Sequence, residues 1–159
     1  MPLWRLYHPD TILNTPEEKS IIASKITSMY TAVGLPAFYV VVLFWPLPAT
    51  NIYIGGHPSI VSSPSHPPTA AGAAPPFVRY VASNIARKLP GPEAHQRFMK
   101  RVNDTLGTVM LEKGWDWEIH FDETERELWR ISGLKAPPTG SEEERLWREE
   151  NKAIPWEKL

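Results

Sequence analysis

The pattern of hydrophobic and polar positions in the first part of the chain predicts a strand, a helix and a second strand. Leu3 to Tyr7 is short, apolar and aromatic, which is typical of a strand. The stretch Thr15 to Glu18 then starts a helix, with threonine as N-cap, proline at the first helical position and glutamate closing a capping box. Gly34 is suited to end this helix, and the apolar run from Phe38 to Trp45 predicts a strand buried on both faces. The apolar face of the helix consists of Ile22, Ile26, Met29 and Val33.

The same order of elements returns in the second part of the chain. Phe77 to Ala86 is expected to form a strand, and Gly91-Pro92-Glu93 opens a second helix, which Gly114 ends. Trp115 to Phe121 alternates between apolar and polar residues, as a half-buried strand does. The side of the second helix that we expect to be buried consists of Phe98, Val102, Thr105, Leu106 and Val109.

These two strand–helix–strand units define the predicted fold class, which is α/β (α+β) with tandem β-α-β units. Right-handed crossovers would give one four-stranded sheet with two helices on one face. The opposite face of the sheet would be bare and would carry apolar side chains from the strand Phe38 to Trp45. Because a bare apolar face needs a partner, we expect the chain to self-associate.

The chain divides into a core domain, residues 1–136, and a docking tail, residues 137–159. Within the core, Asn51 to Ile54 predicts a short strand. The Pro/Ala-rich segment 57–76 contains no Lys, Arg, Asp or Glu, and we interpret it as a mobile insertion. In the tail, a helix is expected from Glu142 to Asn151. Because Trp147 and Trp156 would otherwise be exposed, the tail is expected to dock on the body or on a neighbouring subunit.

Composition and charge narrow the possible functions. The chain has 159 residues and a net charge of -1, which argues against a general binder of nucleic acid or of anionic membranes. The absence of cysteine excludes disulfides, thiolate zinc sites and a cysteine nucleophile. The 5 histidines have no metal-binding spacing, and Gly55-Gly56 precedes a proline-rich loop instead of a helix. We therefore expect neither a metal nor a phosphate-bearing cofactor.

The same reading gives an expectation about the compartment. The N-terminal residues lack the basic-then-apolar pattern of a signal peptide. The longest apolar run, from Val33 to Pro48, is too short to span a bilayer and is bracketed by prolines. A soluble cytoplasmic protein is the expectation.

The order of the motifs resembles that of the tautomerase superfamily. Pro2-Leu3-Trp4 stands at the start, Thr15-Pro16 opens the first helix, and Asn51 to Gly56 matches an asparagine, an apolar triplet and a glycine pair. The stretch Glu127 to Leu134, followed by Pro137-Pro138, is similar to a fungal branch of oxalocrotonate tautomerase-like proteins. Outside the insertion, the chain thus resembles the cis-3-chloroacrylic acid dehalogenase group. This resemblance implies a cofactor-free enzyme, a small carboxylate substrate and a homotrimer whose three sheets face inward.

The chemistry implied by the resemblance depends on Pro2. Once Met1 is removed, Pro2 carries a secondary amine at the N-terminus. An α-amino group has a pKa of about 7.7–8.0, and burial or a nearby cation lowers it towards neutrality, where a general base is efficient. If Met1 is retained, the Pro2 nitrogen is an amide without basicity and this chemistry is absent.

The resemblance also implies other site residues. The arginine that binds the carboxylate falls on Arg87, with Arg79 as the alternative if the alignment shifts at the insertion, and the second arginine of the family falls on Pro90. The family's histidine and late tyrosine fall on Tyr30 and His120. Tyr30 could donate a hydrogen bond to an enolate oxygen, and His120 could polarise a carbonyl. For each of these side chains an ordinary structural role stays open.

These departures from the family pattern decide between reaction types. The water-activating glutamate of the dehalogenases falls on Ile131, and Glu127 is the nearest carboxylate. Without such a base, hydration and hydrolytic dehalogenation are disfavoured, whereas a keto–enol shift needs no activated water. We therefore predict a tautomerase or isomerase of small 2-oxo or enol carboxylic acids, including aryl ones. The alternatives are a dehalogenase or hydratase of unsaturated three-carbon acids, and a binding protein that keeps the fold without the activity.

Overall fold

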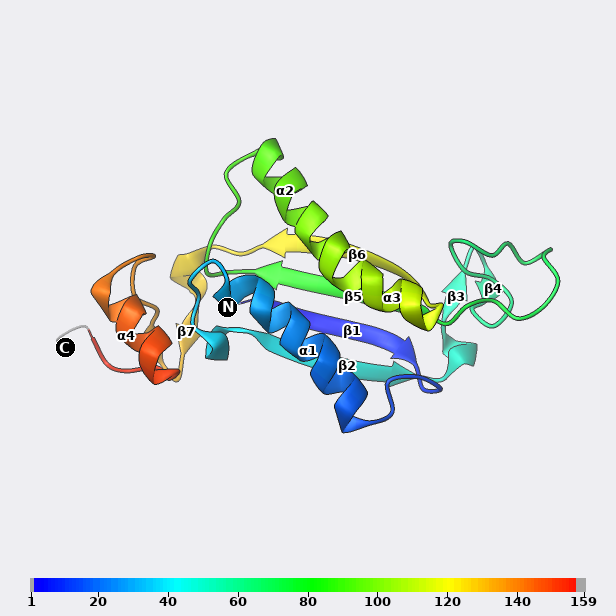
Figure 1. Cartoon of the computed structure of the whole chain (residues 1–159), viewed down its shortest axis with the longest axis horizontal. Coiled ribbons are helices and arrows are strands. Elements are labelled where there is room, and N and C mark those ends of the chain that lie inside the picture. Colours follow the sequence, from blue (N-terminus) through cyan, green and yellow to red (C-terminus); the bar gives the residue numbers. More distant parts are fainter. Residues whose placement is uncertain (1, 157–159) are drawn as a thin grey trace.

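The computed structural model describes residues 2–156 and contains one four-stranded sheet, shown in Figure 1. The order of its strands is β2-β1-β5-β6. In the first unit β1 (Leu3–Pro9) runs parallel to β2 (Val41–Leu47), and in the second unit β5 (Phe77–Asn84) runs parallel to β6 (Asp116–Glu123). The two units join through antiparallel pairing of β1 with β5. The predicted tandem β-α-β arrangement is confirmed.

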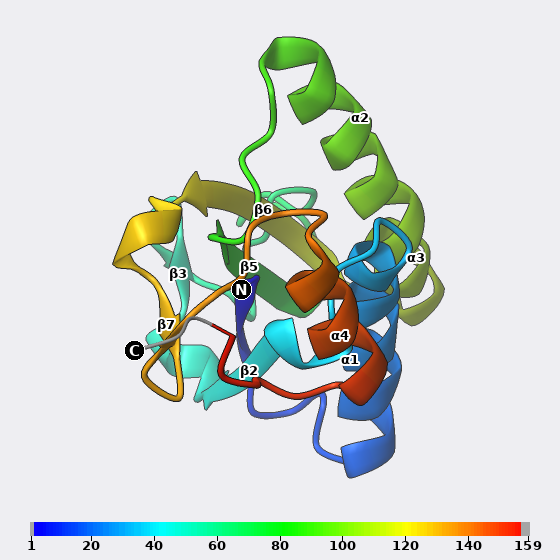
Figure 2. The ribbon, with the colours of Figure 1, turned by 90° about the vertical axis from the view of Figure 1, so that its left-hand side faces the viewer.

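The helices of both units cover one face of this sheet, as Figures 1 and 2 show. In the first unit, α1 (Pro16–Thr31) begins with the predicted capping box between Thr15 and Glu18. In the second, α2 (Pro92–Val102) continues through a π-helical turn, Asn103–Gly107, into α3 (Thr108–Lys113). Gly114 ends α3 with a φ of 66°, a left-handed conformation that glycine adopts at little cost. The alternate strand residues that face the helices therefore form the core.

The core is rich in aromatic rings. Trp4 on β1 is fully buried and makes edge-to-face contacts with Tyr80 and Phe121, at centroid distances of 6.1 and 5.2 Å. Such pairs add stability beyond the burial of their area. The helices contribute the aliphatic part of the core, chiefly Ile22, Ile26, Leu106 and Met110.

The second strand differs from our expectation of burial on both faces. After a 3₁₀ turn at Ala37–Tyr39, β2 begins at Val41 and forms one edge of the sheet. Because helices cover only one face, side chains that point the other way are partly exposed, with Leu43 at 38% and Trp45 at 47% exposure. The apolar run therefore reflects one core-facing side and one uncovered side.

The insertion is attached to the body of the domain. The short strands β3 (Tyr53–Ile54) and β4 (His57–Pro58) pair at its start. Further along, the hydroxyls of Ser63 and Ser65 both donate to Oδ2 of Asp116, and the Ser65 backbone N–H donates to the same oxygen at 2.8 Å. The insertion, which we interpret as mobile, is therefore hydrogen-bonded to the start of β6 at this point, and serine hydroxyls supply these bonds in a segment without Lys, Arg, Asp or Glu.

The tail docks on the same chain, at the end of the sheet where β1 begins (Figure 2). After the short pair β7 (Arg130–Ile131) and β8 (Leu134–Lys135), the predicted helix is present as α4 (Glu142–Glu150). Trp147 is fully buried against the rings of Phe38 and Tyr39, and its Nε1 donates to the Ile154 carbonyl at 2.8 Å. Trp156 Nε1 donates to the Lys135 carbonyl. We expected the tail to dock either on the body of its own chain or on a neighbouring subunit. In the structure it docks on its own chain.

Candidate active site

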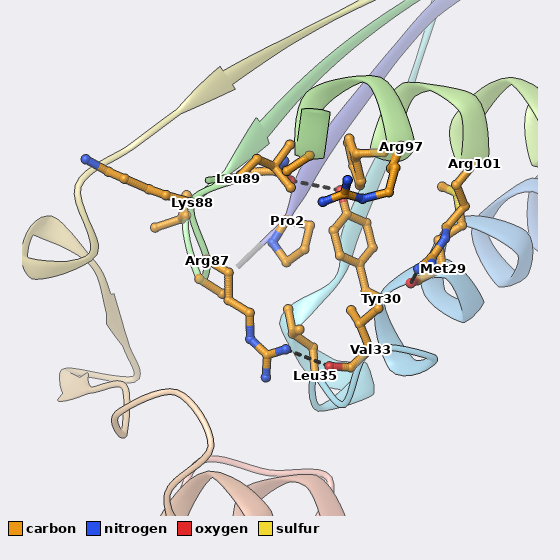
Figure 3. A pocket seen from close by; sticks show the side chains of 15 residues that line it. Pro2, Met29, Tyr30, Val33, Leu35, Arg87, Lys88, Leu89, Arg97 and Arg101 are labelled. Carbon is orange, nitrogen blue, oxygen red and sulfur yellow. Dashed lines mark hydrogen bonds between the residues drawn. The ribbon is translucent and has the colours of Figure 1, made fainter. Parts of the chain in front are cut away.

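A cavity of about 320 Å³ lies at the end of the sheet where β1 begins and β5 ends, shown in Figure 3. Its walls come from four parts of the chain: Pro2, the end of α1 with the following turn, the segment after β5, and the first turns of α2. The volume is in the range of small-molecule sites. Among the predicted site residues, Pro2, Tyr30 and Arg87 all line this cavity.

Pro2 is held in place by the start of the sheet. It is buried, and its carbonyl accepts a hydrogen bond from the Val41 backbone N–H at 3.0 Å. This bond extends the parallel pairing of β1 with β2 by one step, so the proline ring has a fixed position at the cavity wall (Figure 3). Whether Met1 is removed concerns a position outside the described residues.

Tyr30 lies in a buried hydrogen-bond chain. Its hydroxyl accepts from Trp4 Nε1 at 3.1 Å and donates to Asn84 Oδ1 at 2.9 Å. Burial raises the pKa of Tyr30, so the phenol stays protonated at neutral pH. The sequence analysis did not identify Trp4 or Asn84 as part of the site. Asn84 is the last of the alternate β5 residues that are buried, and a polar residue at a core-facing position could have indicated a functional role from the sequence.

The cavity wall is cationic. Arg87, Lys88, Arg97 and Arg101 all line it, and within residues 2–156 no aspartate or glutamate does. Arg87 is the most constrained: its Nη1 donates to the Val33 carbonyl at 2.6 Å, and its Nη2 lies 3.2 Å from Oε2 of Glu144. Such a surface favours an anionic ligand.

Two of these cations come from α2, and the sequence analysis missed them. Arg97 and Arg101 are four residues apart, so they lie on the same side of the helix, next to Phe98. Arg97 lies 3.6 Å from Glu93 in an exposed ion pair, and Arg101 donates to the Met29 carbonyl at 3.5 Å. From sequence alone they look like ordinary solvated charges on an amphipathic helix.

His120 does not line this cavity, contrary to its predicted place in the site. On β6 it pairs with Val81 and points to the face of the sheet without helices. There its Nδ1 lies 2.9 Å from Nη2 of Arg79, which also forms an ion pair with Glu118. Strand alternation explains this placement: the neighbours of His120 in the sequence, Ile119 and Phe121, pack on the core, so His120 points away from it.

The two fallback residues also lie elsewhere. Arg79 shares the helix-free face with His120, so of the two alternatives for the carboxylate-binding arginine only Arg87 lines the cavity. Glu127 is exposed and lines a separate, shallower depression beside Lys88 and Arg126. No carboxylate therefore stands beside Pro2 in the cavity as the structure describes it.

The described residues contain neither a metal-binding cluster nor a membrane-spanning helix. In residues 2–156 no cluster of three or more His, Cys, Asp or Glu side chains could hold a metal ion. In the same range no helix combines the length and the apolar character needed to cross a membrane.

Two β-α-β units that share one sheet, with Pro2 in a cavity at the end of that sheet, define a tautomerase-type fold. Residues 1–152 match the family described as "Putative oxalocrotonate tautomerase enzyme", and the chain belongs to this family within the tautomerase superfamily. The predicted superfamily is confirmed. No curated protein matches the chain.

Solved structures agree with this assignment. The chain is 40% identical to AU4130/APC7354, "a probable enzyme from the thermophilic fungus Aspergillus fumigatus", with 98% of each chain covered and a TM-score of 0.81. It is 37% identical to native RhCC from Rhodococcus jostii RHA1, with 97% of this chain and 99% of that chain covered and a TM-score of 0.83.

Two more distant structures share the fold alone. N1, a member of the cis-3-chloroacrylic acid dehalogenase family, is 15% identical, with a TM-score of 0.64 over 94% of this chain and 97% of its own. A fused 4-OT described as an asymmetric trimer is 22% identical, with a TM-score of 0.56 over 87% of this chain and 99% of its own.

Proposed function

We propose that the protein is a cofactor-free tautomerase of small 2-oxo or enol carboxylic acids, with Pro2 as the general base. The observation that carries this proposal is that Pro2 lies in a cavity with four cationic residues and no acidic one. Nearby positive charge and burial both lower the pKa of an amine. A proline amine in this setting would be neutral and basic near neutral pH, once Met1 has been removed.

The proposed reaction moves one proton. The Pro2 nitrogen takes the proton from the enol hydroxyl, and the ammonium that results protonates the neighbouring carbon. The enol thus becomes a ketone and the amine returns to its starting state, without water or a redox partner. Tyr30 lines the cavity, and its hydroxyl stays protonated because burial raises its pKa. Since its one proton is donated to Asn84 Oδ1, the hydroxyl would have to release Asn84 in order to stabilise the enolate oxygen.

Arg87 is the proposed anchor for the substrate carboxylate. A guanidinium has five N–H donors, and the bonds to Val33 and Glu144 leave others for a ligand. The rest of the wall is largely apolar, with Met29, Leu35 and Phe98 among the lining residues. A cationic anchor beside an apolar wall suits a ligand with one anionic end and an apolar body, as in aryl 2-oxo acids such as phenylpyruvate in its enol form.

The alternative reactions receive less support. A dehalogenase or hydratase must activate water, and within the described residues no carboxylate lines the cavity. A binding protein without activity would have the same cationic cavity as a tautomerase and would differ from it only by the absence of turnover. The assay of Pro2 below separates this alternative from the tautomerase.

The test is the Pro2→Ala variant, measured by the ultraviolet absorbance of phenylenolpyruvate as it ketonises. We expect kcat/KM to fall by about 100-fold or more, the lower range of a general base's contribution. Intact mass establishes beforehand that Met1 is absent from both proteins. The control is Pro155→Ala, at an exposed position of the tail, which should retain full activity. Equal turnover of Pro2→Ala and wild type would refute the proposed base.

The proposal includes a homotrimer. The helix-free face of the sheet exposes Leu43 and Trp45, and the fused 4-OT with the same fold is described as a trimer. Burial of this face between three copies would remove apolar surface from water at roughly 25 cal/mol per Å².

A further inference from the structure

The C-terminal helix reaches the cavity through a buried carboxylate. The Glu144 side chain is only 2% exposed, and glutamate is almost never so deeply buried unless it is paired. Its Oε2 accepts from the Gly140 backbone N–H at 2.7 Å and lies 3.2 Å from Nη2 of Arg87. A residue of the tail is therefore bonded to a cation of the cavity wall.

Helix capping alone does not require this position of Glu144. In a complete capping box the third helical residue accepts from the N-cap backbone N–H, as Glu18 does for Thr15 at the start of α1. At the start of α4, the Ser141 hydroxyl accepts from the Glu144 N–H, but the Ser141 N–H donates to the Pro138 carbonyl instead. Glu144 keeps the bond to the residue before the N-cap, Gly140, as Glu18 does with Asn14, and the same oxygen also lies against Arg87.

The same helix also holds the turn that forms the other side of the cavity. Arg148 donates to the Gly34 carbonyl at 3.3 Å, and Asn151 Oδ1 accepts from the Phe38 backbone N–H at 2.9 Å. Between these two contacts lies Leu35, and directly before them Val33, whose carbonyl accepts from Arg87. The guanidinium is therefore fixed from two directions, by the turn and by the helix that clamps the turn.

We propose that Glu144 is a positioning residue that fixes the Arg87 guanidinium for a carboxylate ligand; the role in substrate binding rests on the function proposed above. An arginine side chain has considerable rotamer entropy, and a ligand bound by a mobile arginine must bear its loss. When Glu144 holds Arg87 in place before the ligand arrives, the side-chain entropy of Arg87 is already lost on folding. Binding of the ligand then does not incur this cost. The C-terminal helix is then part of the binding site instead of a mere surface appendage.

The experiment compares the length of the side chain with its charge. Glu144→Gln keeps the length and an oxygen acceptor for Arg87 but removes the charge. Glu144→Asp keeps the charge but withdraws the carboxylate by one methylene. Glu142→Gln is the matched control, because Glu142 is an exposed carboxylate on the same helical turn, paired with Arg145.

Two readouts are measured for each protein. The first is the rate at which phenylglyoxal modifies Arg87 without substrate, followed by mass spectrometry. The second is KM and kcat with phenylenolpyruvate. For Glu144→Asp we expect faster modification and a KM raised by roughly tenfold, on the scale of one hydrogen bond to a charged group, with kcat changed much less. Glu144→Gln should stay within about twofold of wild type in both readouts.

The outcomes separate this proposal from the proposed function. Arg87 reactivity is read without turnover, so an inactive wild-type protein would refute the tautomerase while still testing Glu144. The positioning role is overturned if Glu144→Gln is impaired while Glu144→Asp matches wild type, because charge alone would then matter. It is also overturned if neither variant changes Arg87 reactivity, or if Glu142→Gln has the same effect as Glu144→Asp.

Discussion

The hydroxyl of Tyr30 joins two elements that meet at the cavity, since it accepts from Trp4 Nε1 and donates to Asn84 Oδ1. Removing it in Tyr30→Phe leaves both buried partners without their bond. We expect the free energy of unfolding in urea to fall by about 1–3 kcal/mol, the cost of buried unsatisfied groups, and kcat to fall as well. Tyr80→Phe is the control: its hydroxyl makes only a long bond, 3.6 Å, to Met110 Sδ, so the loss should be smaller. Equal losses would contradict the importance of this chain.

At the residue scale, the sequence correctly placed Pro2, Tyr30 and Arg87 together in one cavity. Each of them lies at an end of a predicted strand or helix, and the order of these elements determines where their ends meet in the fold. His120 lies outside the cavity, which the alternation of Trp117, Ile119 and Phe121 already indicates by placing it on the opposite face, and its catalytic role stays a prediction. Glu144 could not be predicted, because its contact with Arg87 joins residues 57 positions apart in the sequence. No local pattern encodes such a contact.

At the element scale the helix boundaries were predictable and the environment of the strands was not. The start of α1 follows from a capping box, and the end of α3 from Gly114, both of which act within one turn. Whether β2 is central or at an edge depends on which strand pairs with β1 on the other side, which is β5. The position of β2 in the sheet is therefore set by pairing between distant parts of the chain. The residues Phe38 to Trp45 do not indicate it by themselves.

The attachment of the insertion to β6 gives an element-scale prediction about pH. Partial burial alone would raise the pKa of Asp116, but hydrogen bonds from Ser63 and Ser65 favour its carboxylate, and the pKa is lowered from 3.8. A group whose pKa is lower in the folded state stabilises the fold above its unfolded pKa, and this contribution disappears as the pH falls through the folded value. The attachment should therefore weaken in acid and persist at neutral pH.

The measurement is the free energy of unfolding of Asp116→Asn relative to wild type across pH. At pH 7 we expect the variant to be less stable by about 1–2 kcal/mol, since charged hydrogen bonds become neutral ones. The difference should shrink between about pH 5 and pH 3, as the wild-type carboxylate takes up a proton. Asp104→Asn, which removes an exposed carboxylate paired with Lys100, is the control. A difference that stays constant over this range would show that Asp116 is not the titrating group.

At the scale of the whole molecule, the helix-free face is the surface through which we expect copies of the chain to assemble. Leu43, Trp45 and Tyr7 form the apolar part of this face, with Tyr7 and Trp45 in edge-to-face contact at 5.2 Å and Arg5 of β1 paired with Leu43. On the same face β6 contributes Glu118, His120 and Asp122. The face is thus mostly apolar along one side and charged along the other. Since Trp147 and Trp156 already have partners within the chain, the sheet and not the tail is the surface available for contact between copies.

We expect wild-type protein at micromolar concentration to scatter light as three chains per particle, with a melting temperature that rises with concentration. Trp45→Lys places a charge at the centre of the apolar side, and it should shift the particle to a monomer because the charge would be buried without a partner. Leu111→Lys is the control, since Leu111 is 82% exposed on α3, in the helix layer on the other side of the sheet, and it should leave the trimer intact. A wild-type monomer, or a Trp45→Lys trimer of unchanged stability, would exclude assembly through this face. Monomeric Trp45→Lys that still ketonises phenylenolpyruvate would show further that the cavity around Pro2 is complete within one chain, as its lining by residues of a single chain leads us to expect.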